Sequence, residues 1–120
     1  NKTSLPEKFK YNFFLKNTAI LTSTMVIKRE KIGLIKFLNT KICEDYFFKC
    51  KLLKKINANK CFSKNVTFYR IAKNSLQSSK IRNFYWVWLI NSRYNKMNFI
   101  KNLLSLLSIS INSLKNYGFK

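Results

Sequence analysis

Apolar residues recur at three- and four-residue spacing along most of the chain, a spacing typical of helices that bury one face. Ile32, Ile35 and Leu38 show it in the first such segment. The pattern predicts four helices, over residues 28–42, 44–56, 66–94 and 98–117.

Glycine and proline are scarce between and within these segments. The 120 residues include two glycines and one proline, whereas all-β folds need many turns, and turns recruit both residues. The predicted fold class is therefore all-α, a small basic protein with a long basic helix followed by a C-terminal helical bundle. Residues 18–27, which are Thr-rich and β-branched, are the best strand or turn candidate, and residues 57–65 are predicted to be a polar, basic link.

The first 17 residues alternate aromatic and basic side chains. This segment contains Phe9, Tyr11, Phe13 and Phe14 among Lys8, Lys10 and Lys16. The alternation predicts an extended aromatic and basic N-terminal arm, lying on a partner or forming a short strand. The chain is accordingly divided into a basic arm with a helical extension, residues 1–62, and a helical domain, residues 63–120, whose expected partner follows from the charge and the resemblance given below.

The charge balance narrows the choice of partner. Lys and Arg number 24 against four acids, which gives a net charge of +20. Such a chain is best explained if nucleic acid, an anionic membrane or an acidic protein neutralises it. AT-rich coding explains the preference for Lys over Arg but not the shortage of acids. Because basic and apolar residues are interleaved throughout, as in ribosomal proteins, we expect one face to pack on protein and another on RNA phosphate.

The basic positions around the third predicted helix are the candidate contacts with RNA. Their spacings of three, seven and eleven residues would let a helix pair with successive phosphates, and the alternative is a solvated charged face. An exposed aromatic among them can stack on an unpaired base, whereas Phe84 and Trp88, four apart, are expected to pack inward. The predicted RNA-binding residues are Arg70, Lys73, Lys80, Arg82, Arg93, Lys96 and Trp86.

Catalytic chemistry has few candidates in this sequence. The chain has no histidine, so the most common general base is missing. Among its four acids, Glu44 and Asp45 are adjacent, and adjacent residues point in different directions on a helix. No glycine-rich phosphate loop is present. These observations predict a protein that is not an enzyme, with no cofactor and no small-molecule substrate.

The three cysteines and the apolar stretches add two expectations. Cys43, Cys50 and Cys61 form no C-x-x-C pair, so they are expected to be ordinary reduced cysteines, and the alternative is a metal ligand shared with a neighbouring chain. The apolar stretches are shorter than the ~20 residues that a membrane-spanning helix needs.

The segment 82–89 resembles ribosomal protein L20 of bacterial and organellar large subunits. Arg82, Phe84, Val87, Trp88 and Leu89 take the places of that family's R-x-F-x-x-L-W-I run. Further on, segments 99–103 and 107–112 resemble its F-I-x-G-L and A-x-V-x-I-D/N blocks. The resemblance covers about the last third of the chain. It implies a helical domain on large-subunit rRNA, with the basic helix that leads into the Trp block touching RNA through Arg70, Lys73, Lys80 and Arg82.

Charge, pattern and resemblance together predict a structural constituent of an organellar ribosome. The expected location is the mitochondrion, with the plastid as second choice. The expected partners are rRNA and neighbouring ribosomal proteins, and the expected role is to support assembly. Two alternatives stay open: a ribosomal or ribonucleoprotein component of another family, and a peripheral basic subunit of a membrane-associated complex held to anionic lipid by its arm.

Overall fold

A computed structural model describes residues 6–61 and 79–117 of the chain, without the side chains of residues 116 and 117. The described part is mostly helical, as predicted, and adds a two-stranded antiparallel sheet. In chain order its elements are β1 (Lys8–Phe9), α1 (Tyr11–Asn17), the 3-10 turn η1 (Thr22–Thr24), α2 (Arg29–Ile32), α3 (Glu44–Leu53), β2 (Ala58–Asn59), α4 (Lys80–Leu89), the π-helical turn η2 (Ile90–Tyr94) and α5 (Phe99–Tyr117).

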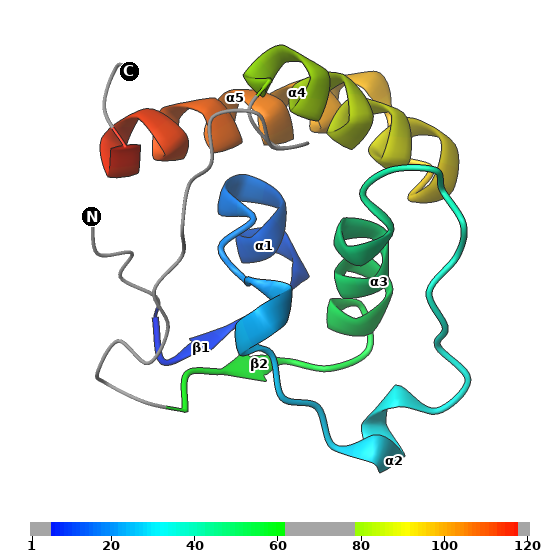
Figure 1. Cartoon of the computed structure of the whole chain (residues 1–120). Helices are drawn as coiled ribbons and strands as arrows, with labels where there is room; N and C mark the ends of the chain where they lie inside the picture. The colour runs from blue at the N-terminus through cyan, green and yellow to red at the C-terminus, as the bar shows by residue number, and fades with distance from the viewer. Residues whose placement is uncertain (1–5, 62–78, 118–120) are drawn as a thin grey trace.

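The helices form two groups that meet at the core. Helices α4 and α5 lie together across one end of the molecule, over α1 and α3, while the sheet and α2 lie toward the other end (Figure 1). Strand β1 pairs with β2 so that Lys8 lies opposite Asn59 and Phe9 opposite Ala58. The sheet thus ties the segment before α1 to the segment after α3.

The prediction of an extended N-terminal arm over residues 1–17 is wrong for residues 11–17, because these residues form α1. Phe14 and Leu15 are buried in the main core, and the Phe14 ring stacks on Tyr46 at 5.4 Å between centroids. The helix ends where Thr18 adopts a left-handed conformation and its amide donates to the Phe14 carbonyl at 2.8 Å. The alternating pattern of residues 9–13 favoured an extended strand. The helix is favoured instead because it lets the adjacent residues Phe14 and Leu15 both be buried where α1 packs on α3 and α5.

Helix α3 confirms the prediction for residues 44–56 to within three residues at its end. Acidic residues occupy its first turn and Lys51 its last, which suits the helix dipole. Tyr46, Phe47, Cys50 and Leu53 face the main core. The opposite face contributes to a second cluster, whose buried members are Ile35, Phe48 and Leu52.

The predicted helix over residues 28–42 is wrong beyond its first turn. Only Arg29–Ile32 is helical, and Gly33 then takes a positive φ of 53°. Farther along, the Asn39 side chain accepts a hydrogen bond from the amide of Lys41, and Thr40 donates to the carbonyl of Ile42. Such local side-chain hydrogen bonds compete with helix formation, so the apolar spacing alone misled the prediction.

Two short connections differ from prediction only in detail. The strand or turn expected within residues 18–27 is the 3-10 turn η1, and the link expected at residues 57–65 contains β2. The domain boundary expected between residues 62 and 63 lies outside the described residues and stays a prediction.

Helix α5 confirms the prediction for residues 98–117, and α4 with η2 forms the described part of the predicted helix 66–94. The Ser79 hydroxyl accepts from the Arg82 amide at 3.4 Å, and the Asn98 side chain accepts from the Lys101 amide at 3.0 Å. Both are N-cap contacts that begin the helices. The amide of Asn95 donates to the carbonyl five residues earlier, which makes η2 a π turn.

A buried network of amide and hydroxyl groups joins α3, η2 and α5. Asn91 and Asn102 are fully buried. The Tyr46 hydroxyl donates to the Asn91 amide oxygen at 3.0 Å, and the Asn91 amide nitrogen donates to Asn102 at 3.1 Å. Asn102 in turn donates to the Trp88 carbonyl at 3.0 Å and to Ser92 at 2.9 Å. Burial raises the pKa of the Tyr46 phenol, so it remains a donor at neutral pH.

Candidate active site

Asp45 lies in the first turn of α3, at the surface of the molecule. Cys43, which precedes the helix, has a left-handed conformation with φ of 61°, and this sharp turn sets the direction in which the helix begins. The N-terminal end of a helix carries partial positive charge, which favours an ionised carboxylate there.

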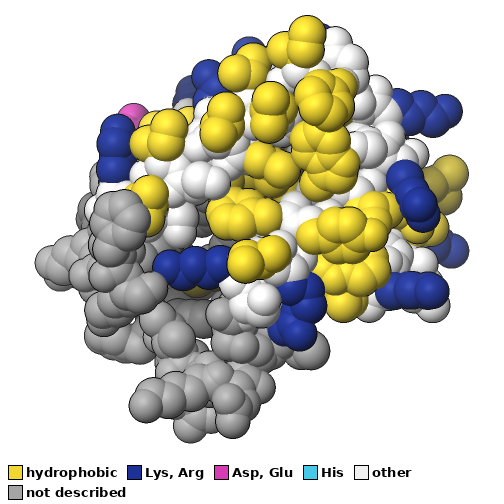
Figure 2. All heavy atoms as spheres, turned by 90° about the horizontal axis from the view of Figure 1, so that it is seen from above, with side chains coloured by type: hydrophobic (Ala, Val, Ile, Leu, Met, Phe, Trp, Pro, Cys, Tyr) yellow, Lys and Arg dark blue, Asp and Glu magenta, His cyan; other side chains and the backbone are white. Residues whose placement is uncertain are grey.

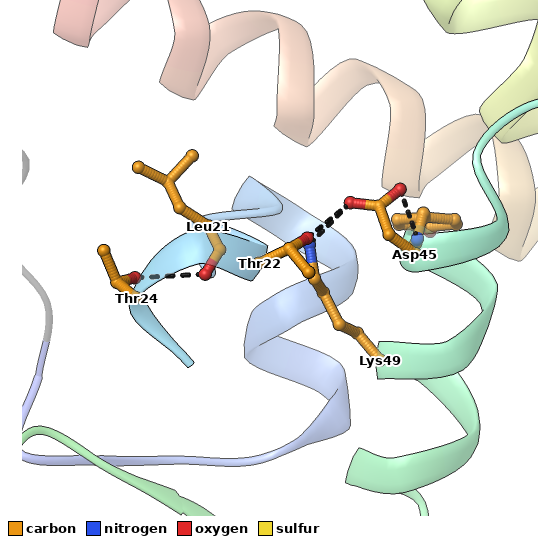
Figure 3. Close-up of polar contacts among 6 residues, drawn as sticks. Leu21, Thr22, Thr24, Asp45 and Lys49 are labelled. Carbon is orange, nitrogen blue, oxygen red and sulfur yellow. Dashed lines mark hydrogen bonds and ion pairs between the residues drawn. The ribbon is translucent and has the colours of Figure 1, made fainter. Parts of the chain in front are cut away.

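Two other side chains hold the carboxylate of Asp45 in place (Figure 3). The Thr22 hydroxyl donates to Oδ2 at 2.8 Å, and the Lys49 ammonium donates to the same oxygen at 2.9 Å. The backbone amide of Tyr46 donates to Oδ1 at 2.8 Å. Because Thr22 belongs to η1 and Lys49 to the next turn of α3, the site is built from two segments, with Thr22 lying 23 residues before Asp45.

The turn that carries Thr22 is itself stabilised by a local contact. The Thr24 hydroxyl donates to the Leu21 carbonyl at 3.0 Å, and the Thr24 amide donates to the same carbonyl at 3.1 Å. Both contacts close the 3-10 turn, which fixes the position of the Thr22 hydroxyl beside α3 (Figure 3).

Burial is unequal across the ion pair. The side chain of Lys49 is 6% exposed, whereas that of Asp45 is 41% exposed. Burial by itself would raise the pKa of the Asp45 carboxyl, but the hydrogen bond and charge of Lys49, together with Thr22 and the Tyr46 amide, hold that pKa below its usual range. The result is a carboxylate that is fixed, ionised at neutral pH and still open to a ligand.

Such a carboxylate can accept a proton from a hydroxyl group that approaches it, without any histidine. The chain's other acids, Glu7, Glu30 and Glu44, are exposed on the surface. The sequence did contain part of the signal, because Asp45 and Lys49 are four residues apart and therefore neighbours on a helix. The contribution of Thr22 from a distant turn had no signal in the sequence.

A shallow hollow of about 320 Å³ lies at the opposite end of α3. It is lined by Lys10, Tyr11, Asn12, Leu53, Lys54, Lys55, Ile56 and Asn57. Burial raises the pKa of the Tyr11 phenol, and the ammonium of Lys54 lies 5.2 Å from its ring centroid. The hollow is basic and separate from Asp45.

The described cations predicted to bind RNA lie on two consecutive elements and the segment after them: Lys80 and Arg82 in α4, Arg93 in η2 and Lys96 beyond it. Arg70 and Lys73 lie outside the described residues, and the described cations Lys80, Arg82, Arg93 and Lys96 are exposed. The π turn that contains Arg93 takes about one residue more per turn than an α-helix, so the eleven-residue spacing from Arg82 to Arg93 is not a regular three-turn α-helical repeat.

The three aromatic residues named in the prediction, Phe84, Trp86 and Trp88, are all half-buried. Trp86 is half-buried beside Tyr85, so it is less available than predicted. Trp88 packs edge-on against Phe99 with 5.3 Å between ring centroids, while Val87 is the α4 side chain that packs on the main core. The RNA contacts themselves stay a prediction.

The three cysteines are free thiols in different surroundings. Cys50 is fully buried, Cys43 is half-buried at the start of α3 and Cys61 is exposed. Burial raises the pKa of the Cys43 and Cys50 thiols to about 11. Neither of these two thiols is therefore ionised at neutral pH. Within the described residues, no group of three or more His, Cys, Asp or Glu side chains could hold a metal ion.

Two bacterial proteins are similar to this chain over most of its length. It is 29% identical over 114 residues to TuaG of Bacillus subtilis (strain 168), which is named as a putative teichuronic acid biosynthesis glycosyltransferase. It is 28% identical over 112 residues to a protein of Haemophilus influenzae named as an uncharacterized glycosyltransferase. Each alignment covers 92% of this chain and 44% of the relative, so the chain spans less than half the length of the curated relatives that it matches.

No family model and no solved structure matches the chain significantly. The two relatives nevertheless overturn the ribosomal interpretation, because they align over nearly the whole chain, whereas the resemblance to ribosomal protein L20 covered only three short blocks. Those blocks are aromatic and apolar segments that amphipathic helices of many families supply. The prediction of an rRNA-binding constituent of an organellar ribosome, of this or another ribosomal family, is therefore wrong.

The linked predictions about catalysis, partners and location are wrong for the same reason. Glycosyltransferases are enzymes that act on small sugar donors and on acceptors, which conflicts with a non-enzyme whose partners are rRNA and ribosomal proteins. Both relatives are bacterial, which removes the basis for a mitochondrial or plastid location. The prediction had excluded catalysis because the chain has no histidine and no facing pair of carboxylates, but a single carboxylate can also act as a general base.

Proposed function

We propose that this chain forms part of a glycosyltransferase and that Asp45 is its general base. The proposal is carried by the fixed, ionised and accessible carboxylate at the start of α3. It is supported by the similarity to two proteins named as glycosyltransferases. The substrates proposed are a sugar nucleotide as donor and a hydroxyl-bearing acceptor.

In the proposed step, an oxygen of the acceptor hydroxyl forms a bond to the anomeric carbon of the donor sugar. The bond from that carbon to the phosphate oxygen breaks, and the nucleotide leaves with the electron pair. The acceptor's proton passes to the carboxylate of Asp45. The hydroxyl becomes more acidic as its oxygen bonds to carbon, so a carboxylate with a lowered pKa can accept the proton late in the step.

The neighbours of Asp45 orient it for this role. Thr22 and Lys49 both bind Oδ2, and the Tyr46 amide fixes Oδ1. Three hydrogen bonds from three directions leave the carboxylate little freedom to rotate, and a positioned base is more effective than a mobile one. Lys49 also keeps the group ionised, and therefore able to accept a proton, in the absence of substrate.

The test is the isosteric substitution Asp45→Asn in the full-length protein. Nucleotide release would be measured from a panel of sugar nucleotides, with an extract of the source cells' envelope polysaccharides and lipids as acceptor. Loss of the base is expected to lower kcat about 100- to 10,000-fold with a small change in KM. Glu44→Gln, a change of the adjacent exposed acid, serves as the matched control and should leave kcat within about twofold.

A purely structural role for Asp45 would give a different result. In that case Asp45→Asn would lower the unfolding temperature but retain kcat at temperatures where the protein is folded. Thr22→Val, which removes one hydrogen bond and keeps the carboxylate, should retain most of the activity if Asp45 is the base. Full activity in folded Asp45→Asn would refute the assignment.

A further inference from the structure

Helix α5 buries polar side chains, while most of its large apolar side chains are exposed. Asn102 and Ser105 are buried, and the Ser105 hydroxyl donates to the Leu15 carbonyl of α1 at 2.6 Å. Two turns further on, the Asn112 amide donates to the Lys16 carbonyl of α1 at 3.0 Å. The face of α5 that packs on the protein is therefore the face with hydrogen-bonding groups.

The opposite face of α5 is an apolar surface interrupted by Ser110, which is half-buried and donates to the Leu106 carbonyl within the helix. At about 100° per residue its members fall within an arc of roughly 140° around the helix. Their exposed fractions run from 38% to 68%. These residues, called here the outer face, are Phe99, Ile100, Leu103, Leu104, Leu107, Ile111 and Leu114.

Cations lie at the margins of the outer face. Lys101 and Lys115 are exposed and follow one edge of the apolar arc, about 60° and 20° beyond Leu104 on the helix. Arg93 and Lys96 are exposed on the segment that leads into α5. Figure 2 looks onto this end of the molecule and shows apolar side chains gathered over it, with Lys and Arg side chains around the margin.

The charge of the chain restricts what can cover the outer face. All four acids lie in the first 45 residues, so the sequence after Asp45 contains cations and no acid. A second copy would bring another net charge of +20 against the same sign. A layer with an apolar interior and a negatively charged surface complements both the apolar arc and its basic margin.

We propose that the outer face of α5 binds an anionic phospholipid membrane, with the helix lying in the plane of the interface. No helix in the described part of the chain is both long and apolar enough to cross a membrane, and this mode of binding needs none. Apolar side chains enter the boundary between headgroups and acyl chains, and the marginal lysines pair with lipid phosphates. This surface is not the N-terminal arm that the sequence suggested for contact with lipid. The apolar residues Phe14 and Leu15 of that arm are buried in the core.

The test measures cosedimentation of the full-length protein with vesicles of phosphatidylglycerol and phosphatidylcholine. We expect binding that rises with the phosphatidylglycerol fraction, falls with added salt and is weak on pure phosphatidylcholine. The double substitution Leu104→Gln/Leu107→Gln should lower the partition coefficient at least about tenfold. Its matched control is Val26→Gln/Leu34→Gln, which changes two side chains that are each 93% exposed outside α4 and α5 and should leave binding unchanged.

A second pair of variants distinguishes binding through the lysines at the margin of the outer face from binding through the net charge of the whole chain. Lys101→Glu/Lys115→Glu should lower binding to anionic vesicles roughly tenfold or more. Lys28→Glu/Lys31→Glu makes the same change in net charge at exposed positions near α2 and should have a much smaller effect. Equal losses in the two pairs would overturn the proposal, because binding would then follow net charge alone.

Three other outcomes would also overturn it. Unchanged binding in Leu104→Gln/Leu107→Gln would show that the outer face does not meet lipid. A self-association that Leu104→Gln/Leu107→Gln abolishes, without vesicle binding, would assign the face to a second copy. No vesicle binding by folded, monomeric protein would mean that another segment or a protein partner covers it. Asp45→Asn should bind vesicles normally, so this result is independent of the proposed base.

Discussion

Helices α3 and α5 meet the rest of the protein in opposite ways. In α3, apolar side chains on two faces are buried, in the main core through Phe47 and Leu53 and in the second cluster through Phe48. In α5, the buried positions include Asn102 and Ser105, and most of the large apolar side chains are exposed, with Leu106 and Ile109 half-buried. One helix is held by packing, and the other is held largely by hydrogen bonds.

The difference shows that apolar periodicity identifies a helix without identifying its buried face. Both helices were predicted from similar spacing of apolar residues, yet only α3 turns those residues inward. In α5 the inward groups satisfy carbonyl acceptors of α1 and α4. Burying a polar group is favourable only when it is hydrogen-bonded, and here each of these groups is.

The largest expected effect on stability is the contrast between a Leu→Gln substitution in α3 and the same substitution in α5. Leu53→Gln should lower the free energy of unfolding by roughly 3 kcal/mol, because Leu53 is buried and the new amide would have no partner there. Leu104→Gln should change it by less than about 0.5 kcal/mol, because that side chain is 57% exposed. Urea unfolding followed by circular dichroism measures both, and equal losses would contradict the inverted orientation of α5.

A smaller effect is expected from the buried network that anchors α5. Asn91→Leu would leave the Tyr46 hydroxyl and the Asn102 amide oxygen without these partners, and should lower the free energy of unfolding by about 2 to 3 kcal/mol. Tyr46→Phe removes a single donor and should cost about 1 kcal/mol. If folded Asn91→Leu is as stable as the natural protein in urea unfolding, then packing and not hydrogen bonding holds α5.

The smallest expected effect on stability concerns the ion pair between Asp45 and Lys49 in α3. The folded-state pKa of Asp45 lies below the unfolded value of about 3.9, so its ion pair stabilises the fold above about pH 5 and the contribution is lost as pH falls through the folded pKa. Since Asp45 is 41% exposed, the contribution is about 1 kcal/mol or less. The difference in unfolding free energy between natural protein and Asp45→Asn should therefore shrink from pH 7 to pH 2. Lys49→Met should reduce that pH dependence, and a difference that grows toward low pH would contradict the assignment.

The sequence predicted the fold where local and tertiary preferences agreed. Residues 44–53 and 99–117 have helical spacing together with suitable ends, and both are helices. Residues 33–42 have the same spacing, but Gly33 at positive φ and the turn at Asn39 redirect the chain. The π turn at residues 90–94 is hydrogen-bonded to α3 and α5 through Asn91 and has no counterpart in the apolar pattern.

The candidate site was less accessible to prediction than the fold. Asp45 and Lys49 share a helix face by spacing, but the importance of the pair depends on burial of Lys49 and on Thr22, both set by tertiary structure. The high positive charge drew attention to phosphate-binding cations and away from the few acids. Asp45 became a candidate because three hydrogen bonds fix its carboxylate, and only the structure shows those bonds.

The hydrogen-bonded inner face of α5 has a consequence for how this helix can vary in evolution. Hydrogen bonds to fixed acceptors demand one side-chain length and one register, so Asn102 and Ser105 tolerate few replacements. In the proposed contact with lipid, outer positions such as Leu104 and Leu107 need only be apolar and can exchange among Leu, Ile, Met and Phe. Aligned homologues should therefore keep residue identity at the buried positions of α5 and only hydropathy at its exposed ones, the reverse of the usual variability of exposed positions.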